Sequence, residues 1–256
     1  MWLDKLFKFR QQSDSDASKP FLEHMEELRW TLVKMAAALG AGMVLSFSFR
    51  AQLVHIVQHP LRTVDPSLVS GLRTLGITDS LTISLQLAFY AGIVLTFPIL
   101  LFFLAQFVLP ALTRQEKKYV LPAIAVGFGL FLTGVLFSYY FVLPKALTFF
   151  FKDAQSLEWQ PTWTVREYFS FVTQITLAFG LSFELPVVVM LLVYLGFLSF
   201  EFLNRTRAYA IVLILILAMI IAPTPDVLTF LSLGAPMCLL YEACIWLAWL
   251  LERRRK

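Results

Sequence analysis

The chain has 256 residues, of which 59% are hydrophobic and only 15% are charged, and its net charge is +4. Soluble domains contain about 45–50% apolar and about 25% charged residues, so this composition excludes a soluble globular protein. The apolar residues form stretches of roughly 20, which suit membrane-spanning helices and are too long for barrel strands. We therefore expect an all-α polytopic membrane protein. The first 20 residues lack the apolar segment of a cleavable signal peptide.

Six apolar stretches are expected to cross the membrane. In chain order they are residues 30–49, 81–109, 120–143, 168–200, 208–222 and 227–251. The last two are expected to be short, because prolines follow the fifth, and the sixth contains Pro236 and Glu242. Residues 50–80 are too charged to cross and contain proline and glycine, which indicates short helices joined by turns. Residues 144–167 and 201–207 are expected outside the membrane, the second as a short charged loop.

The distribution of lysine and arginine orients these stretches. Most of the 21 basic residues fall in the N-terminal segment, in loops 110–119 and 201–207, and in the C-terminal tail. Positive charge marks the cytoplasmic side, so six crossings place both termini in the cytoplasm. We expect a cytoplasmic N-terminal segment at 1–29, a single six-helix membrane domain at 30–251 and a cytoplasmic tail at 252–256.

Glu184 is the only formally charged residue between residues 168 and 200, and it lies at the middle of that stretch. A carboxylate near the bilayer midplane costs about 2.5–3.5 kcal/mol, so it requires a polar partner, a water-filled hollow or protonation. On one continuous helix, Thr173, Gly180 and Glu184 would share a face, where Gly180 allows a close helix approach. Two interpretations stay open: a functional polar site, and a glutamate hydrogen-bonded inside the bundle.

Carboxylates also gather on the expected cytoplasmic side. They are Glu23, Glu26 and Glu27 before the first span, and Glu116 in the first loop. One interpretation is solvation and ion pairing with neighbouring basic residues such as Arg29 and Lys117. The other is a patch that receives guanidinium groups, because carboxylates bind arginine through two hydrogen bonds.

The remaining polar residues indicate structural roles. Asp226 is expected to cap the last helix, and Glu242 to pair with a neighbouring helix near the membrane edge. His55 and His59 are four residues apart but have no third ligand nearby, so no metal site is expected. Since no phosphate-binding loop and no nucleophile–base arrangement is apparent, we expect no cofactor, no catalytic residues and no enzymatic activity.

Several short motifs occur in a characteristic order. They are His-Met-Glu-Glu-Leu-Arg at 24–29, Gln-His-Pro-Leu at 58–61, Phe-Val-Leu-Pro-Ala-Leu at 107–112 followed by Glu116, Ser-Phe-Glu-Leu-Pro at 182–186, Thr-Pro-Asp at 224–226, and Pro-Met at 236–237 followed by Glu242. This ordered set resembles the TatC family, the core subunit of the twin-arginine protein translocase. Motif positions expected to be structural or secondary are Arg29, Pro60, Pro110, Pro186, Asp226 and Glu242.

The resemblance implies a Sec-independent translocase subunit that recognises the twin-arginine signal peptides of folded proteins. It implies that Glu27, Phe107 and Glu116 bind the signal peptide. It places Glu184 at the position associated with polar residues of TatA- and TatB-type single-span partners. It further implies a bacterial inner membrane location, self-association in a larger complex and transport driven by the proton motive force.

Two other function classes stay open from the residues. A proton- or cation-coupled transporter of small solutes would use Glu184 as its coupling carboxylate, but inverted repeats and paired broken helices are not evident. An intramembrane enzyme would need catalytic partners. Thr31, Asp79 and Gln86 differ from residues common in the TatC family, which bears on packing near the second span and leaves the glutamates unaffected.

Overall fold

The computed structural model describes residues 21–109, 117, 120–221 and 226–255, and every regular element in these ranges is a helix. The helices are α2 Phe21–Ser48, α3 Arg50–Val64, α4 Pro66–Gly71, α5 Asp79–Val108, α6 Val120–Phe137, the π-helix η3 Ser138–Val142, α7 Leu143–Ser156, α8 Val165–Ser182, α9 Leu185–Tyr194, α10 Phe200–Arg205, α11 Arg207–Ile221 and α12 Val227–Arg255. The expected all-α class is confirmed.

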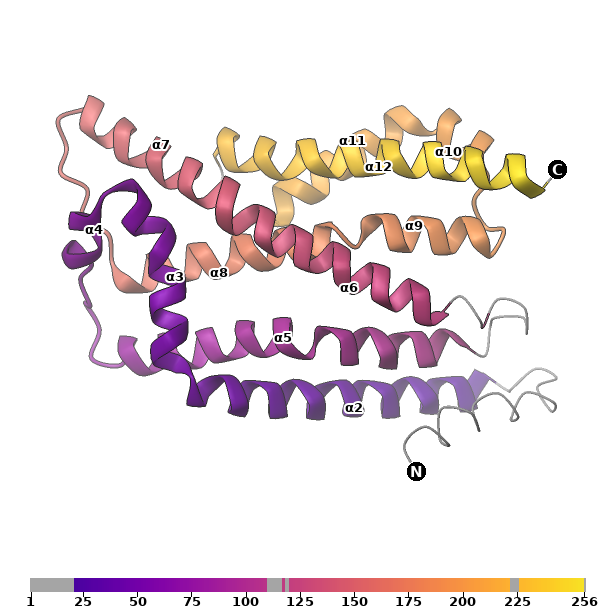
Figure 1. Cartoon of the computed structure of the whole chain (residues 1–256), viewed down its shortest axis with the longest axis horizontal. Coiled ribbons are helices and arrows are strands. Elements are labelled where there is room, and N and C mark those ends of the chain that lie inside the picture. The colour runs from indigo at the N-terminus through magenta and orange to yellow at the C-terminus, as the bar shows by residue number, and fades with distance from the viewer. Residues whose placement is uncertain (1–20, 110–116, 118–119, 222–225, 256) are drawn as a thin grey trace.

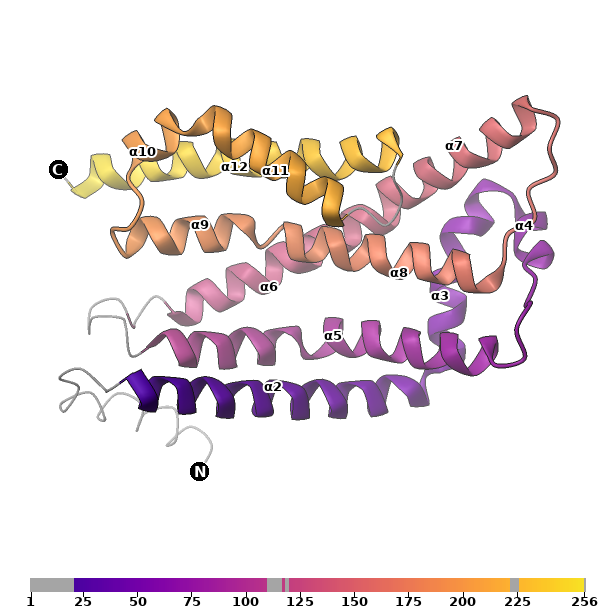
Figure 2. The same cartoon turned by 180° about the vertical axis from the view of Figure 1, so that it is seen from behind.

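The long helices run back and forth along one axis, as Figures 1 and 2 show. The helices α2 and α5 lie side by side along one edge of the bundle, and α11 and α12 lie along the other. Between them, α6 and α7 form one diagonal rod, and α8 continues into α9. The start of α2 and the end of α12 lie at the same end of the bundle, whereas α3 and α4 lie at the opposite end. This arrangement agrees with the expected even number of crossings.

Five stretches in the described ranges are long and apolar enough to span a bilayer. They are Met25–Ser48, Asp79–Val108, Val120–Ser156, Val165–Tyr194 and Thr229–Leu250. The helix α11 is shorter, at 15 residues, so the count of six crossings stays a prediction that depends on it. The last span, Thr229–Leu250, is the shortest of the five at 22 residues, although its helix α12 has 29 residues and continues through Pro236. Proline is tolerated in membrane helices, where neighbouring groups can satisfy the carbonyl it leaves free.

Two helices extend into segments expected outside the membrane. The helix of the third span continues past residue 143 through η3 into α7 and ends at Ser156, and the location of residues 144–156 outside the membrane stays a prediction. The segment expected as a loop at 201–207 contains most of α10, whose first turn is capped by Ser199 through a hydrogen bond from the Phe202 N–H. The short helices expected in residues 50–80 are confirmed as α3 and α4.

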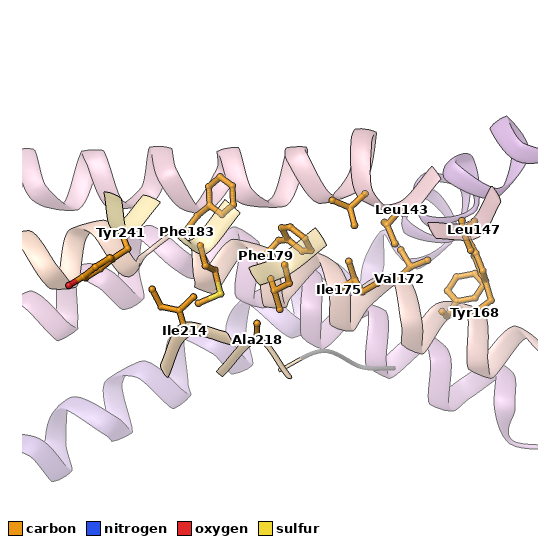
Figure 3. Close-up of a cluster of buried hydrophobic side chains, with 14 of the residues drawn as sticks. Leu143, Leu147, Tyr168, Val172, Ile175, Phe179, Phe183, Ile214, Ala218 and Tyr241 are labelled. Carbon is orange, nitrogen blue, oxygen red and sulfur yellow. The ribbon is translucent and has the colours of Figure 1, made fainter. Parts of the chain in front are cut away.

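The core follows one face of α8. Figure 3 shows Tyr168, Val172, Ile175 and Phe179 in a row, with Phe183 beyond the end of that helix. The spacing of three and four residues puts these side chains on one stripe of a helix. Each of the five is less than 9% exposed, so the fourth span is the centre of the core, with α5 and α6 packed against α8 and α12 packed against α9.

Candidate functional site

The fourth span is interrupted at Glu184. Helix α8 ends at Ser182 and α9 begins at Leu185, with Pro186 in its first turn. Because proline has no N–H, Pro186 cannot donate to the Ser182 carbonyl as a continuous helix would require. The Glu184 N–H instead donates to the Leu181 carbonyl at 3.1 Å. The helix is therefore not continuous through residue 184, although Gly180 and Glu184 both face α6, as expected for residues on a shared face.

The Glu184 side chain lies against the backbone of α6. A Cβ atom built on Gly127 would be 3.1 Å from Glu184 Oε2, so the carboxylate occupies space that a larger residue would fill. Glu184 Oε1 is buried and has no hydrogen-bond partner within the described residues. A buried acceptor without a donor is unfavourable by about 1–3 kcal/mol. The described part of the bundle thus does not supply the internal hydrogen bond that one interpretation of the sequence required.

A hollow of about 270 Å³ opens beside this carboxylate. Its lining comes from α8, α9, α12 and the junction between the first two, and consists of Leu181, Ser182, Glu184, Leu185, Val188, Val189 and Met237. Glu184 is the only charged residue in this lining. Chemically, the site offers a hydrogen-bond acceptor at the edge of an apolar hollow, which suits a donor group on an apolar helix.

Glu27 and Phe107 lie at one end of the bundle. Glu27 is near the start of α2 and Phe107 is near the end of α5, and these antiparallel helices pack side by side (Figure 1). Both residues are partly buried. The Thr31 hydroxyl donates to the Glu27 carbonyl at 2.8 Å. Two further predicted positions, Pro110 and Glu116, lie outside the described residues.

Two of the other predicted positions have the structural surroundings that the sequence suggested. Asp226 Oδ1 accepts from the Thr229 N–H at 2.7 Å, which confirms that Asp226 caps α12. Glu242 forms a two-point ion pair with Arg207 of α11, which confirms the expected pairing with a neighbouring helix. Pro60 is buried inside α3, and Arg29 is exposed on α2.

Sequence reasoning missed several polar contacts between elements. Gln86 of α5 donates to Thr173 of α8 at 3.0 Å, inside the apolar part of the bundle. The Phe200 N–H at the start of α10 donates to Glu252 near the end of α12 at 2.7 Å. A glutamine in an apolar stretch can be recognised from the sequence as a candidate for such a contact. The Glu252 contact cannot, because it joins residues 52 positions apart in the chain that only the fold brings together.

A family model described as "Sec-independent protein translocase protein (TatC)" matches residues 23–236. The chain belongs to the TatC family. The TatC of Desulforapulum autotrophicum is 33% identical to it over 236 residues, which are 91% of this chain and 85% of that protein. The TatCy of Bacillus subtilis is 36% identical over 224 residues, which cover 88% and 86% of the two chains.

The structural comparison points to the same family. A crystal structure of "Twin Arginine Translocase Receptor- TatC" superposes with a TM-score of 0.78 at 34% identity, covering 89% of this chain and 98% of that chain. The TatC of Akkermansia muciniphila is 49% identical over 176 residues, and the match spans about half of that protein's length, 51%. TatC proteins are components of a protein translocase, which sets aside the small-solute transporter; the family is not an enzyme family.

Proposed function

We propose that this TatC chain is the translocase subunit that recognises the twin-arginine signal peptides of folded proteins. The observation that carries this proposal is the placement of Glu27 and Phe107 at the same end of the packed α2–α5 pair. A carboxylate and an aromatic ring at one end of the bundle match a peptide that combines arginines with an apolar segment. The name of the similar crystal structure, a twin-arginine translocase receptor, supports this role.

Recognition rests on charge and hydrogen-bond geometry. The Glu27 carboxylate, together with Glu116, would accept the guanidinium groups of the arginine pair through paired hydrogen bonds. Lysine cannot reproduce this planar two-point contact, so replacing the arginines by lysines should weaken binding although the charge is unchanged. Phe107 would contact the apolar part of the peptide.

Glu184 would act in a second step, after the signal peptide has bound. Glu184 lines an apolar hollow, and a polar side chain on the single membrane helix of a TatA- or TatB-type partner would supply the donor that Oε1 lacks within the described residues. In this proposal both termini of the chain face the cytoplasm, the membrane is the bacterial inner membrane, and transport uses the proton motive force. Self-association would build the larger complex.

Export of a folded reporter protein tests this function. In cells that lack their own TatC, the chain and its TatA and TatB partners should export a folded reporter that carries a twin-arginine signal. Glu27→Ala should reduce export by about tenfold or more, since one charge-assisted hydrogen bond contributes about 1.5–3 kcal/mol. Glu26→Ala is the matched control, because Glu26 is the exposed neighbour on the same helix.

Two results would contradict the proposal. One is equal export by Glu27→Ala and the unmodified chain at equal protein levels. The other is export of the same reporter with a twin-lysine signal at the twin-arginine rate.

A further inference from the structure

Pro60 interrupts the hydrogen-bond pattern inside α3. Proline has no N–H, so the carbonyl four residues earlier, that of Ile56, receives no helical hydrogen bond. Pro60 and the following Leu61 are buried, whereas Ile56 is 53% exposed, so the gap lies at the margin of the packed face of α3. The helix α3 lies across the end of the bundle, where it packs against α4, α5, α7 and α8. An unsatisfied carbonyl in this place would weaken the attachment of α3.

The hydroxyl of Tyr139 fills this gap. Tyr139 Oη donates to the Ile56 carbonyl at 2.7 Å, across 83 positions of sequence. Its ring stacks on His59 with a centroid distance of 6.3 Å and an angle of 18° between the planes. The next carbonyl in α3, that of Val57, accepts from the Tyr168 hydroxyl at 2.6 Å. Two tyrosines from the third and fourth spans therefore bind consecutive carbonyls of the turn before Pro60.

The position of Tyr139 depends on the π-helix between α6 and α7. In η3 the Leu143 N–H donates to the Ser138 carbonyl, five residues back, so one turn contains an extra residue. An extra residue rotates the side chains before it by about 100° relative to those after it. Pro144 follows directly, and it too lacks the N–H that a regular turn would need. The widened turn thus lets Leu143 enter the core while Tyr139 reaches α3.

We propose that Tyr139 is a positioning residue paired with Pro60. Its hydroxyl takes the place of the missing Pro60 N–H and fixes α3 against the third span. The contribution of the Tyr139 hydroxyl to the stability of the protein therefore depends on the residue at position 60. This claim rests on contacts within the chain and does not depend on signal-peptide recognition.

A double-mutant cycle on the purified protein in mild detergent tests the pairing. Tyr139→Phe removes one hydrogen bond and should lower the midpoint of thermal unfolding by about 2–4 °C. Tyr140→Phe is the matched control, because Tyr140 is the adjacent residue and is 60% exposed; it should leave the midpoint unchanged. In a Pro60→Ala background the restored N–H can donate to the Ile56 carbonyl, so the shift caused by Tyr139→Phe should fall by at least half.

Tyr168→Phe serves as a second control in the same cycle. Tyr168 binds the Val57 carbonyl, so its effect should be the same with proline or alanine at position 60. An equal effect of Tyr139→Phe in the two backgrounds would overturn the pairing.

Hydrogen–deuterium exchange of Tyr139→Phe alone gives an independent result should Pro60→Ala fail to fold. Amides of residues 50–64 should exchange at least several-fold faster, while those of residues 25–48 should be unaffected. A uniform change, or no change in residues 50–64, would contradict the proposal.

A functional consequence rests additionally on the proposed function. Since α3 lies at the opposite end of the bundle from the start of α2, which contains Glu27 (Figure 1), Tyr139→Phe should lower reporter export while signal-peptide binding stays at the unmodified level. Parallel loss of both would contradict a positioning role. A failure of the proposed function would be recognised separately, because then the unmodified chain would not bind the peptide.

Discussion

Glu184 and Gly127 form a pair in which one residue makes room for the other. The Glu184 carboxylate lies against α6 because position 127 has no side chain, and the break before Pro186 releases residue 184 from the regular helix. A carboxylate with a buried oxygen that has no hydrogen-bond partner within the described residues is unfavourable in an apolar bundle. Its retention there fits a role in binding another polypeptide.

Removal of the carboxylate should separate the two proposed steps. We expect Glu184→Ala to leave signal-peptide binding largely intact and to reduce both reporter export and co-purification of TatA- or TatB-type partners. The reason is that Glu184 lies at the junction of α8 and α9, away from the end that holds Glu27 (Figure 1). Loss of peptide binding with normal partner association would show that the assignment of steps is wrong.

A methyl group on Gly127 should disturb the carboxylate without removing it. The added Cβ would lie 3.1 Å from Glu184 Oε2 and 3.2 Å from Leu101 Cδ1, so the carboxylate must shift by a few tenths of an ångström. We expect Gly127→Ala to weaken partner co-purification about fivefold, equivalent to roughly 1 kcal/mol. Gly129→Ala is the control on the same helix, because nothing lies within 4 Å of its added Cβ. Equal association of both variants would argue against a role for the Glu184 position.

The site was predictable from single residues only in part. A lone glutamate in an apolar stretch identified Glu184, and the Pro-Asp turn identified the Asp226 cap, because both signals are local. The contact with Gly127, and the pairing of Glu242 with Arg207, required the packing of α6 and α11. The sequence placed Glu242 beside some neighbouring helix but could not name Arg207, since the two residues lie 35 positions apart.

At the scale of elements, α6 and α8 approach closely through two glycines. A Cβ on Gly134 would be 2.6 Å from the Phe179 carbonyl oxygen, and a Cβ on Gly180 would be 2.7 Å from the Phe131 ring. This confirms that Gly180 permits a close helix approach. Small residues at helix contacts let backbones pack tightly where burial from water provides no driving force.

Gly134→Ala should therefore loosen this pair of helices. Because the obstructing atom is a backbone oxygen, the helices must separate, and overpacking of this kind costs about 1–3 kcal/mol. We expect the midpoint of thermal unfolding in detergent to fall by about 2–4 °C for each kcal/mol lost. Gly129→Ala, on the open face of the same helix, should leave it unchanged. Equal midpoints for the two variants would contradict the close packing of α6 on α8.

Helix identity followed from hydropathy better than helix boundaries did. The expected span at 81–109 agrees closely with α5 at Asp79–Val108, because its apolar run is uninterrupted. The third span was expected to stop at residue 143, before Lys145, Lys152 and Asp153, and its helix continues to Ser156. Charge limits how far a segment lies in lipid and does not by itself end a helix, so these residues did not mark where the helix ends. The interruption at residues 183–184 comes from Pro186, whose effect the apolar run concealed.

For the whole molecule, the proposed recognition and partner sites lie in different places. Glu27 and Phe107 are at the end of the bundle that also holds the end of α12, and Glu184 is at the junction inside the fourth span (Figures 1 and 2). The opposite end is covered by α3 and α4. A signal peptide could thus bind at one end before its apolar segment approaches the hollow beside Glu184.

Site-specific crosslinking of a twin-arginine signal peptide in membranes tests the central claim most directly. A photoreactive residue beside the arginine pair should crosslink to the segment that contains Glu27, in the unmodified chain and in the Glu26→Ala control. The crosslink should be lost or reduced at least tenfold with Glu27→Ala, with Glu116→Ala, and with a peptide whose arginines are lysines. Equal crosslinking in all of these cases would contradict recognition of the arginine pair by this chain.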